Sequence, residues 1–228
     1  MEILAPAGSL PAMKSAVFSG ADAVYFGGGD FNARIRAKNF TEEEIASGVR
    51  FCRERGVKCY AAMNTLVTDR ELPQAMRLAS FFAECGVDAF IVQDTGLASL
   101  LKRATQIPLH ASTQMTVHTL DGILALAEAG FSRVVLSREL SQADLRYILM
   151  HAPCEIEVFV HGALCMCYSG QCYMSSLIGN RSGNRGACAQ PCRLPYQDGY
   201  SLSLKDLCLL KYVKDLEQMG VSSLKIEG

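Results

Sequence analysis

LPAMKSAVFSGADAVYF, residues 10–26, contains the pattern that decides the fold of this chain. An amphipathic stretch at 10–19 predicts a helix, Gly20 is suited to close that helix in the left-handed conformation, and the apolar run at 23–26 predicts a strand. The apolar run is continuous, as expected of a parallel strand that is buried on both faces. The same order of amphipathic stretch, glycine and apolar run recurs around Gly56, Gly86, Gly130 and Gly220.

Eight apolar runs predict strands, at residues 2–5, 23–26, 58–62, 89–92, 109–111, 133–136, 155–160 and 223–226. Amphipathic stretches between them predict helices at 10–19, 41–55, 72–85, 119–129 and 141–151. Thr41 and Glu44 form a capping-box pattern at the start of the second helix. Eight strands that alternate with helices favour an α/β fold of the (β/α)8 TIM-like barrel type over a doubly wound open sheet.

Two features depart from a regular barrel. Residues 162–200, here called the cysteine segment, stand where a simple helix should follow the seventh strand, and long irregular insertions are usually functional. No closing helix follows the eighth strand. We therefore expect residues 1–228 to be the barrel domain of a longer protein. Its further C-terminal domain, or a partner subunit, would cover the open end of the barrel.

Composition limits the possible function classes. A net charge of -1 argues against a protein that binds polyanions over its whole surface, so contact with RNA would need a local basic patch. The N-terminus lacks the basic and apolar regions of a signal peptide. No apolar run reaches the ~18 residues of a membrane helix. We expect a cytoplasmic protein with no membrane contact, and in that compartment clustered cysteines more often bind metal than form disulfides.

The cysteine segment holds five of the ten cysteines, among Gly, Ser, Asn and Arg. Four of them have the spacing C-x6-C-x15-C-x3-C, and these are Cys165, Cys172, Cys188 and Cys192. Such density indicates ligands of a metal centre, whereas the scattered cysteines in apolar surroundings, such as Cys52 and Cys208, suit a core. Only the last pair has the spacing of a structural zinc site. An iron–sulfur cluster accepts wider gaps, so the residues favour a cluster and leave zinc as the alternative.

Polar residues follow seven of the expected strands, at the end where such barrels carry their active sites. Loop ends are polar in any case, but seven strand ends in register predict a shared concave site. The residues include Arg34, Asn64, Gln93, Gln114, Arg138, His161 and Glu227.

Three further patterns leave two interpretations each. His161 precedes Cys165 closely, and either forms a thiolate pair with it, as in cysteine peptidases, or only lines the site. One of Glu155 and Glu157 should point into the barrel lumen, where an unpaired carboxylate is costly. A local cluster of arginines either binds phosphate or carboxylate groups or belongs to a solvated loop, and its members are Arg181, Arg185 and Arg193.

Several motifs resemble those of peptidase family U32, the collagenase-like peptidases, and the resemblance covers the whole chain. The longest is EVFVHGALCMCYSGQCYMS at 157–175. Others are LAPAG at 4–8, ASTQM at 111–115, LSREL at 136–140, NRGACAQPCR at 184–193 and LKIEG at 224–228. The family name implies a peptidase of unknown catalytic type. Better-understood relatives are iron–sulfur proteins that hydroxylate without molecular oxygen. Some modify a uridine in tRNA, some a cytidine in ribosomal RNA, and some act in ubiquinone synthesis.

The closely spaced last cysteine pair resembles the RNA-modifying branch, whose members depend on prephenate. That resemblance implies a 4Fe–4S cluster on the four spaced cysteines and hydroxylation of a pyrimidine in tRNA or ribosomal RNA. It implies a substrate pocket lined by Arg34, Gln114, Arg138, His161 and Glu227. It also implies that arginines hold a small carboxylate donor, among them Arg181, Arg185 and Arg193.

Two alternatives remain beside the hydroxylase. One is a metal- or thiol-dependent peptidase, although the chain has neither the His-Glu-x-x-His pattern of zinc peptidases nor the Gly-x-Ser-x-Gly pattern of serine hydrolases. The other is a cluster-bearing scaffold that works only together with a partner subunit.

Overall fold

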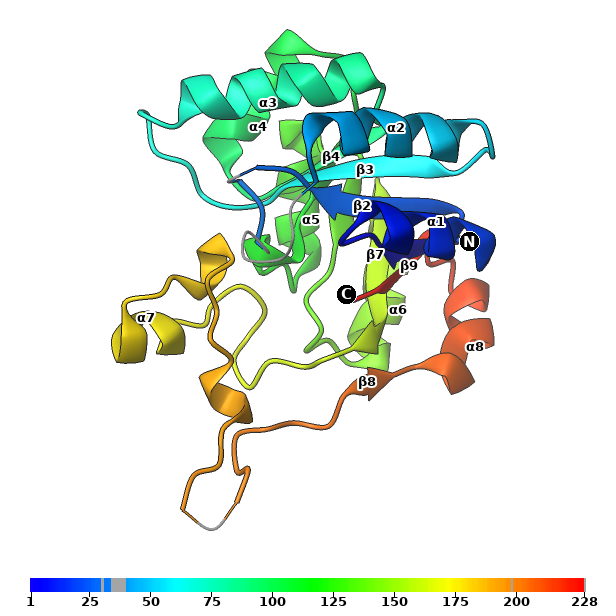
Figure 1. Ribbon diagram of the computed structural model, residues 1–228. Helices are drawn as coiled ribbons and strands as arrows, with labels where there is room; N and C mark the ends of the chain where they lie inside the picture. Colours follow the sequence, from blue (N-terminus) through cyan, green and yellow to red (C-terminus); the bar gives the residue numbers. More distant parts are fainter. Residues whose placement is uncertain (30, 34–39, 198, 228) are drawn as a thin grey trace.

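The computed structural model describes residues 1–29, 31–33, 40–197 and 199–227, and in them eight parallel strands form a closed barrel (Figure 1). Closure comes from the pairing of β1 with β9 and of β7 with both β6 and β9. The predicted (β/α)8 barrel is therefore confirmed, and the open sheet is excluded. The barrel strands are β1 (Glu2–Pro6), β2 (Ala23–Gly27), β3 (Lys58–Met63), β4 (Ala89–Val92), β5 (Leu109–Ala111), β6 (Arg133–Val135), β7 (Glu155–Gly162) and β9 (Ser223–Ile226).

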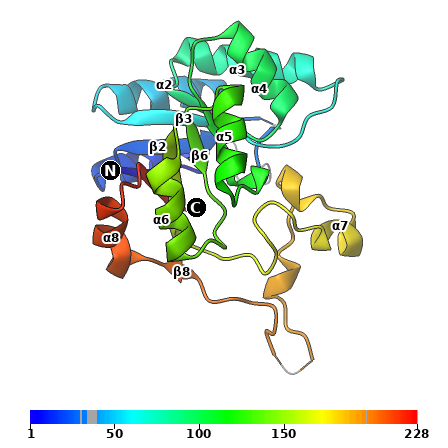
Figure 2. The same ribbon diagram turned by 180° about the vertical axis from the view of Figure 1, so that it is seen from behind.

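A helix follows each of the first six strands and packs on the outside of the barrel (Figures 1 and 2). The helices are α1 (Leu10–Phe18), α2 (Glu42–Arg53), α3 (Leu72–Cys85), α4 (Thr95–Ala104), α5 (Leu120–Ala129) and α6 (Gln142–His151). Thr41 and Glu44 form the predicted capping box at α2. All five glycines of the helix–glycine–strand pattern have positive φ, between 69° and 97°. That conformation favours glycine and confirms the predicted helix ends.

The chain between β7 and β9 is irregular, as expected, and returns to the barrel at β8 (Leu207–Cys208). β8 pairs antiparallel with the end of β7, and α8 (Val213–Gln218) follows it. The cysteine segment projects away from the barrel, with α7 (Met174–Gly179) at its outer end (Figures 1 and 2). Short 3-10 turns complete the described chain, at η1 (Thr113–Met115), η2 (Gly183–Arg185), η3 (Pro191–Arg193) and η4 (Leu210–Tyr212). No helix in the described ranges is long and apolar enough to cross a membrane.

Alternation along the strands divides the core into two parts. Outward side chains pack under the helices; Phe26 of β2, for example, meets Phe82 of α3 with ring centroids 5.9 Å apart. Inward side chains form a smaller apolar cluster in the lumen, made of Leu4, Ala23, Tyr60, Ala89 and Ile91. Polar inward side chains lie below and above this cluster, so the lumen is filled and the site can only lie at an end of the barrel.

Candidate active site at the barrel mouth

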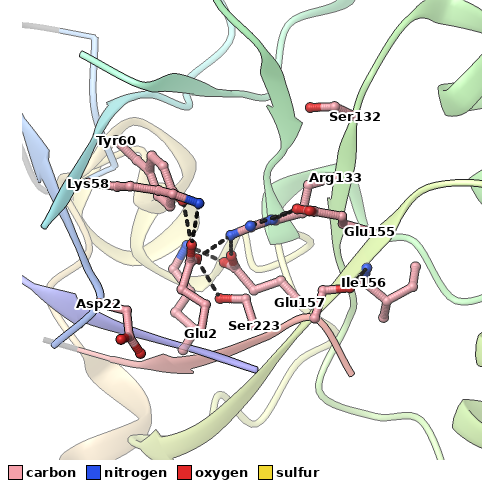
Figure 3. A network of polar contacts seen from close by, with 12 residues as sticks. Glu2, Asp22, Lys58, Tyr60, Ser132, Arg133, Glu155, Ile156, Glu157 and Ser223 are labelled. Carbon is pink, nitrogen blue, oxygen red and sulfur yellow. Dashed lines mark hydrogen bonds and ion pairs between the residues drawn. The ribbon is translucent and has the colours of Figure 1, made fainter. Parts of the chain in front are cut away.

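A network of charged side chains fills the lumen from the N-terminal ends of the strands upward (Figure 3). Arg133 of β6 lies at its centre and pairs with Glu2 at 2.6 Å, Glu155 at 2.7 Å and Glu157 at 3.1 Å. Lys225 of β9 pairs with the other oxygen of Glu157 at 2.9 Å. The Glu157 side chain is fully buried and has two cationic partners in the lumen, whereas Glu155, on the same face of β7, is 55% exposed at the outer end of the network.

These contacts keep the lumen carboxylates ionised. Burial raises the pKa of Glu2, but hydrogen bonds, chiefly from Arg133, outweigh burial and lower that pKa to about 2. Burial likewise opposes ionisation of Glu157, yet Lys225 and Arg133 hold its pKa below the usual value. Burial and the Arg133 charge lower the pKa of His110 to about 3, so its ring is neutral at pH 7. The lumen below the mouth is therefore a fixed set of charges and does not exchange protons near neutral pH.

At the mouth, the ends of β3, β4 and β5 are joined by hydrogen bonds that polar side chains donate. Asn64 donates to the hydroxyl of Ser112 at 3.4 Å and accepts from the backbone N–H of Ala33 at 3.0 Å. The Gln93 side-chain amide donates to the backbone oxygen of Gln114 at 3.3 Å. These strand ends therefore share one polar surface above the lumen cluster.

Arg138 and Glu227 come from the ends of β6 and β9 and form an ion pair. The Arg138 guanidinium also donates to the backbone oxygen of Ala163 at 2.6 Å and lies 4.8 Å from the centre of the Phe159 ring. One cation is thus held at the mouth, at the point where the cysteine segment begins. Arg34, which the sequence placed in the same pocket, lies outside the described residues.

His161 is exposed at the end of β7. Its backbone pairs with Cys208 of β8, and in the described residues no hydrogen bond joins its ring to Cys165. The structure therefore does not support a thiolate pair between His161 and Cys165. Cys208, expected in a core, is exposed because β8 lies outside the barrel.

The cysteine segment is fixed to the mouth by a short, buried contact. Ser169 is 1% exposed, and both its N–H and its hydroxyl donate to one oxygen of Glu139, each at 2.9 Å. The Thr116 hydroxyl donates to the Ser169 backbone oxygen at 2.7 Å. The next residue, Gly170, has φ +76° and lies so close to Gln114 that a Cβ there would be 2.6 Å from its backbone oxygen. Sequence reasoning missed the roles of Ser169 and Thr116; the available signal was a Ser-Gly pair between two spaced cysteines.

The four spaced cysteines are free thiols on this anchored segment. Burial raises the pKa of Cys165, and Cys172 and Cys192 lie near enough to add to that increase. The sulfur of Cys188 accepts from the backbone N–H of Gln190 at 3.3 Å and from the Ser175 hydroxyl at 3.7 Å.

Thiols that accept backbone N–H donors are the ligand type that iron–sulfur clusters use. The donor chemistry therefore fits such a cluster. Within the described ranges, however, no three cysteine, histidine or acidic side chains are grouped closely enough to hold a single metal ion.

The three arginines of the cysteine segment have partners inside the protein. Arg185 makes a two-pronged pair with Glu71, with distances of 2.6 and 3.2 Å, and this contact lowers the pKa of Glu71 to about 2. Arg193 donates to the backbone oxygens of Leu204 and Leu164. Arg181 donates to a backbone oxygen of its own loop. In this structure the three side chains stabilise the cysteine segment. Their role in binding a small carboxylate substrate stays a prediction.

A cavity of about 350 Å³ lies between α6, β7 and α8, and Arg138 and Phe159 are among the residues that line it. Its lining is mostly apolar, with Leu145, Leu209 and Leu216 among the contributors, and it includes none of the four spaced cysteines. We therefore place the candidate site at the mouth, where the strand-end polar groups and the cysteine segment meet.

Comparison with known proteins finds a matching family model and several relatives of similar sequence. A family model described as "Peptidase family U32" matches residues 8–228. The chain is 41% identical to "23S rRNA 5-hydroxycytidine C2501 synthase" of Escherichia coli (strain K12), covering all of this chain and 36% of that protein. It is 37% identical to "tRNA hydroxylation protein P1" of Bacillus subtilis (strain 168), covering all of this chain and 58% of that protein.

A third relative is "Collagenase" of Porphyromonas gingivalis (strain ATCC BAA-308 / W83), 34% identical, with all of this chain and 60% of that protein covered. The chain thus spans between about a third and three fifths of the length of these relatives. Among solved structures, the U32 peptidase Mk0906 superposes with a TM-score of 0.72 at 14% identity, over all of this chain and 93% of that one. At that identity the likeness shows the fold alone.

Proposed function

Because this chain belongs to peptidase family U32, we propose that it is the barrel domain of an enzyme that hydroxylates a pyrimidine base in tRNA or ribosomal RNA. The observation that carries the proposal is the combination of four free thiols, on a segment anchored at the polar barrel mouth, with whole-chain similarity to proteins named for RNA hydroxylation. We propose further that the reaction uses a 4Fe–4S cluster and no molecular oxygen.

The four spaced cysteines would hold the cluster, which supplies redox chemistry when it is bound. The chain's own residues do the positioning. The contact between Ser169 and Glu139 fixes the segment relative to the strand ends. Arg138, held by Glu227 and lying beside the Phe159 ring, provides a cation at the mouth. A guanidinium in a site shielded from water suits a small carboxylate donor such as prephenate, which would compete with Glu227 for Arg138.

The RNA assignment is tested by deleting the gene in its host and analysing the nucleosides of tRNA and ribosomal RNA by mass spectrometry. We expect one hydroxylated pyrimidine to disappear and to return with the wild-type gene but not with Cys172→Ala. Cys208→Ala is the matched control, because Cys208 is an exposed thiol outside the set of four and its loss creates no cavity. Unchanged nucleosides in the deletion strain would overturn the proposal.

The cluster assignment is tested on protein purified without oxygen. We expect a brown protein that contains iron and sulfide in equal amounts, and we expect its visible absorbance to be lost when Cys165, Cys172, Cys188 or Cys192 is changed to Ala. Cys208→Ala should keep the colour. Stoichiometric zinc without iron would instead show a structural zinc site.

The alternative of a peptidase rests on the name of the family and of the Porphyromonas gingivalis relative. Its discriminating test is cleavage of gelatin by the purified protein. Proteolysis would be favoured over hydroxylation by two results together. The purified protein cleaves gelatin and its His161→Ala variant does not, and deletion of the gene leaves the RNA nucleosides of the host unchanged.

A further inference from the structure

Two glutamine side chains at the barrel mouth carry buried oxygens that have no hydrogen-bond partner among the residues that the structure describes. They are Oε1 of Gln93, at the end of β4, and Oε1 of Gln114, in η1 after β5. A buried acceptor left without a donor is costly, because it has given up its hydrogen bonds to water. Two such atoms on neighbouring strand ends therefore indicate a place where a bound molecule supplies the donors.

The geometry fixes which way the Gln93 amide faces. Its nitrogen donates to the backbone oxygen of Gln114, an acceptor, so its own oxygen must be turned away from that contact. Alternation along β4 places Gln93 on the same face as Ala89 and Ile91, which belong to the lumen cluster. The Oε1 atom of Gln93 therefore lies at the end of the lumen that opens to the barrel mouth.

The backbone of Gln114 is held from two sides. Gln93 donates to its oxygen from β4, and Gly170 of the cysteine segment packs directly against it. The two glutamines are thus adjacent to each other and lie next to the anchored part of the segment that carries the thiols. A base that reached these oxygens would lie at the mouth, beside the proposed reaction centre.

The two pyrimidines of RNA differ in what they offer to such an acceptor pair. Cytosine has an exocyclic amino group with two N–H donors, whereas uracil has a carbonyl oxygen at the same ring position. The Gln93 oxygen, whose direction is fixed by the contact with Gln114, is an acceptor that matches the amino group. It would leave the uracil oxygen facing another oxygen, and a site built to hydrogen-bond one group strongly rejects an analogue that lacks it.

We propose that Gln93 and Gln114 bind the exocyclic amino group of a cytosine that enters the barrel mouth, so that the substrate base is cytidine and not uridine. This inference rests on the proposed function, because the proposed reaction is what restricts the donor-bearing ligand to a pyrimidine. The base reaches the mouth only if it leaves its stack, as bases do in other enzymes that modify them.

The binding test uses the 228-residue chain with cytidine and uridine 5′-monophosphates as probes, titrated and followed by NMR. We expect cytidine monophosphate to bind more tightly, by roughly 5- to 150-fold, which is the discrimination a good pair of base contacts provides. Gln93→Leu and Gln114→Leu should each reduce that ratio towards one, and Gln114→Glu, which keeps an acceptor, should preserve it. Gln106→Leu is the matched control, since Gln106 is exposed before β5 at the opposite end of the barrel.

Equal binding of the two nucleotides, a preference for uridine monophosphate, or binding of neither would overturn the assignment. The assignment would also be overturned if Gln106→Leu lowered the ratio as much as Gln114→Leu does.

The nucleoside analysis of the deletion strain separates this inference from the proposed function. Loss of a hydroxycytidine supports both. Loss of a hydroxyuridine refutes the binding of cytosine by Gln93 and Gln114 but still supports an RNA hydroxylase. Loss of no hydroxylated nucleoside refutes the hydroxylase itself.

Discussion

Glu157 is a fully buried carboxylate, and each of its two oxygens faces a different cation. Lys225 lies 2.9 Å from one oxygen and Arg133 lies 3.1 Å from the other. Lys225 is also buried, and its ammonium lies 4.4 Å from the centre of the Tyr25 ring. The sequence predicted that either Glu155 or Glu157 could point into the lumen, and it indicated neither which of the two is buried nor that Arg133 and Lys225 would be its partners.

Changing Lys225 to Met should destabilise the protein by about 3–5 kcal/mol, because it leaves a buried carboxylate with half of its compensating charge. The measurement is the free energy of unfolding in urea. Lys58→Met is the matched control: its side chain is 58% exposed and its ion pair with Glu2 is 3.4 Å long, so the cost should stay below about 1 kcal/mol.

A second change makes the cause specific. Adding Glu157→Leu to Lys225→Met removes the uncompensated charge and should recover part of the lost stability. If the double variant is as unstable as the sum of the single ones, the loss is one of packing and the electrostatic explanation is wrong.

At the scale of elements, the cysteine segment depends on a small contact with the loops after β5 and β6. Ser169 is bound by Glu139, and Gly170 fits against the backbone of Gln114 with no room for a side chain. The positive φ of Gly170 adds a second reason for glycine at this position. This contact, more than any regular element, sets where the thiols lie relative to the barrel.

Gly170→Ala should therefore detach the cysteine segment while leaving the barrel folded. The readout is the rate of proteolytic cleavage within residues 162–200, which we expect to rise roughly tenfold or more, since about 1.4 kcal/mol of lost local stability corresponds to tenfold more open segment. Gly56→Ala is the control, because Gly56 has a similar φ of +69° and nothing lies within 4 Å of its added Cβ. Equal cleavage of both variants would show that the close approach to Gln114 is unimportant.

At the scale of the whole molecule, the barrel was predictable and the site only in outline. The strands lie within about two residues of the predicted runs, because a strand buried on both faces must be continuously apolar. The helix α4 was not among the predicted ones, although Asp94 caps its start and Leu97 and Leu101 face the core. β8 has only two residues and no periodicity to detect. The pairing of Arg185 with Glu71 joins positions 114 residues apart, and composition cannot indicate such a partner.

The charged lumen also dictates when this barrel can form during synthesis. Glu2, near the start of the chain, bonds to Arg133 and to Ser223, which are 131 and 221 residues further along. A nascent chain that has reached β7 already carries Glu157 and Arg133 but still lacks Lys225, so its interior must stay hydrated around a carboxylate that has only one of its two cations. The strand that closes the barrel is therefore also the one that neutralises it. Folding is accordingly dominated by contacts of long sequence separation, and a ribosome-bound intermediate stays open, with unpaired sheet edges for chaperones to protect, until β9 emerges.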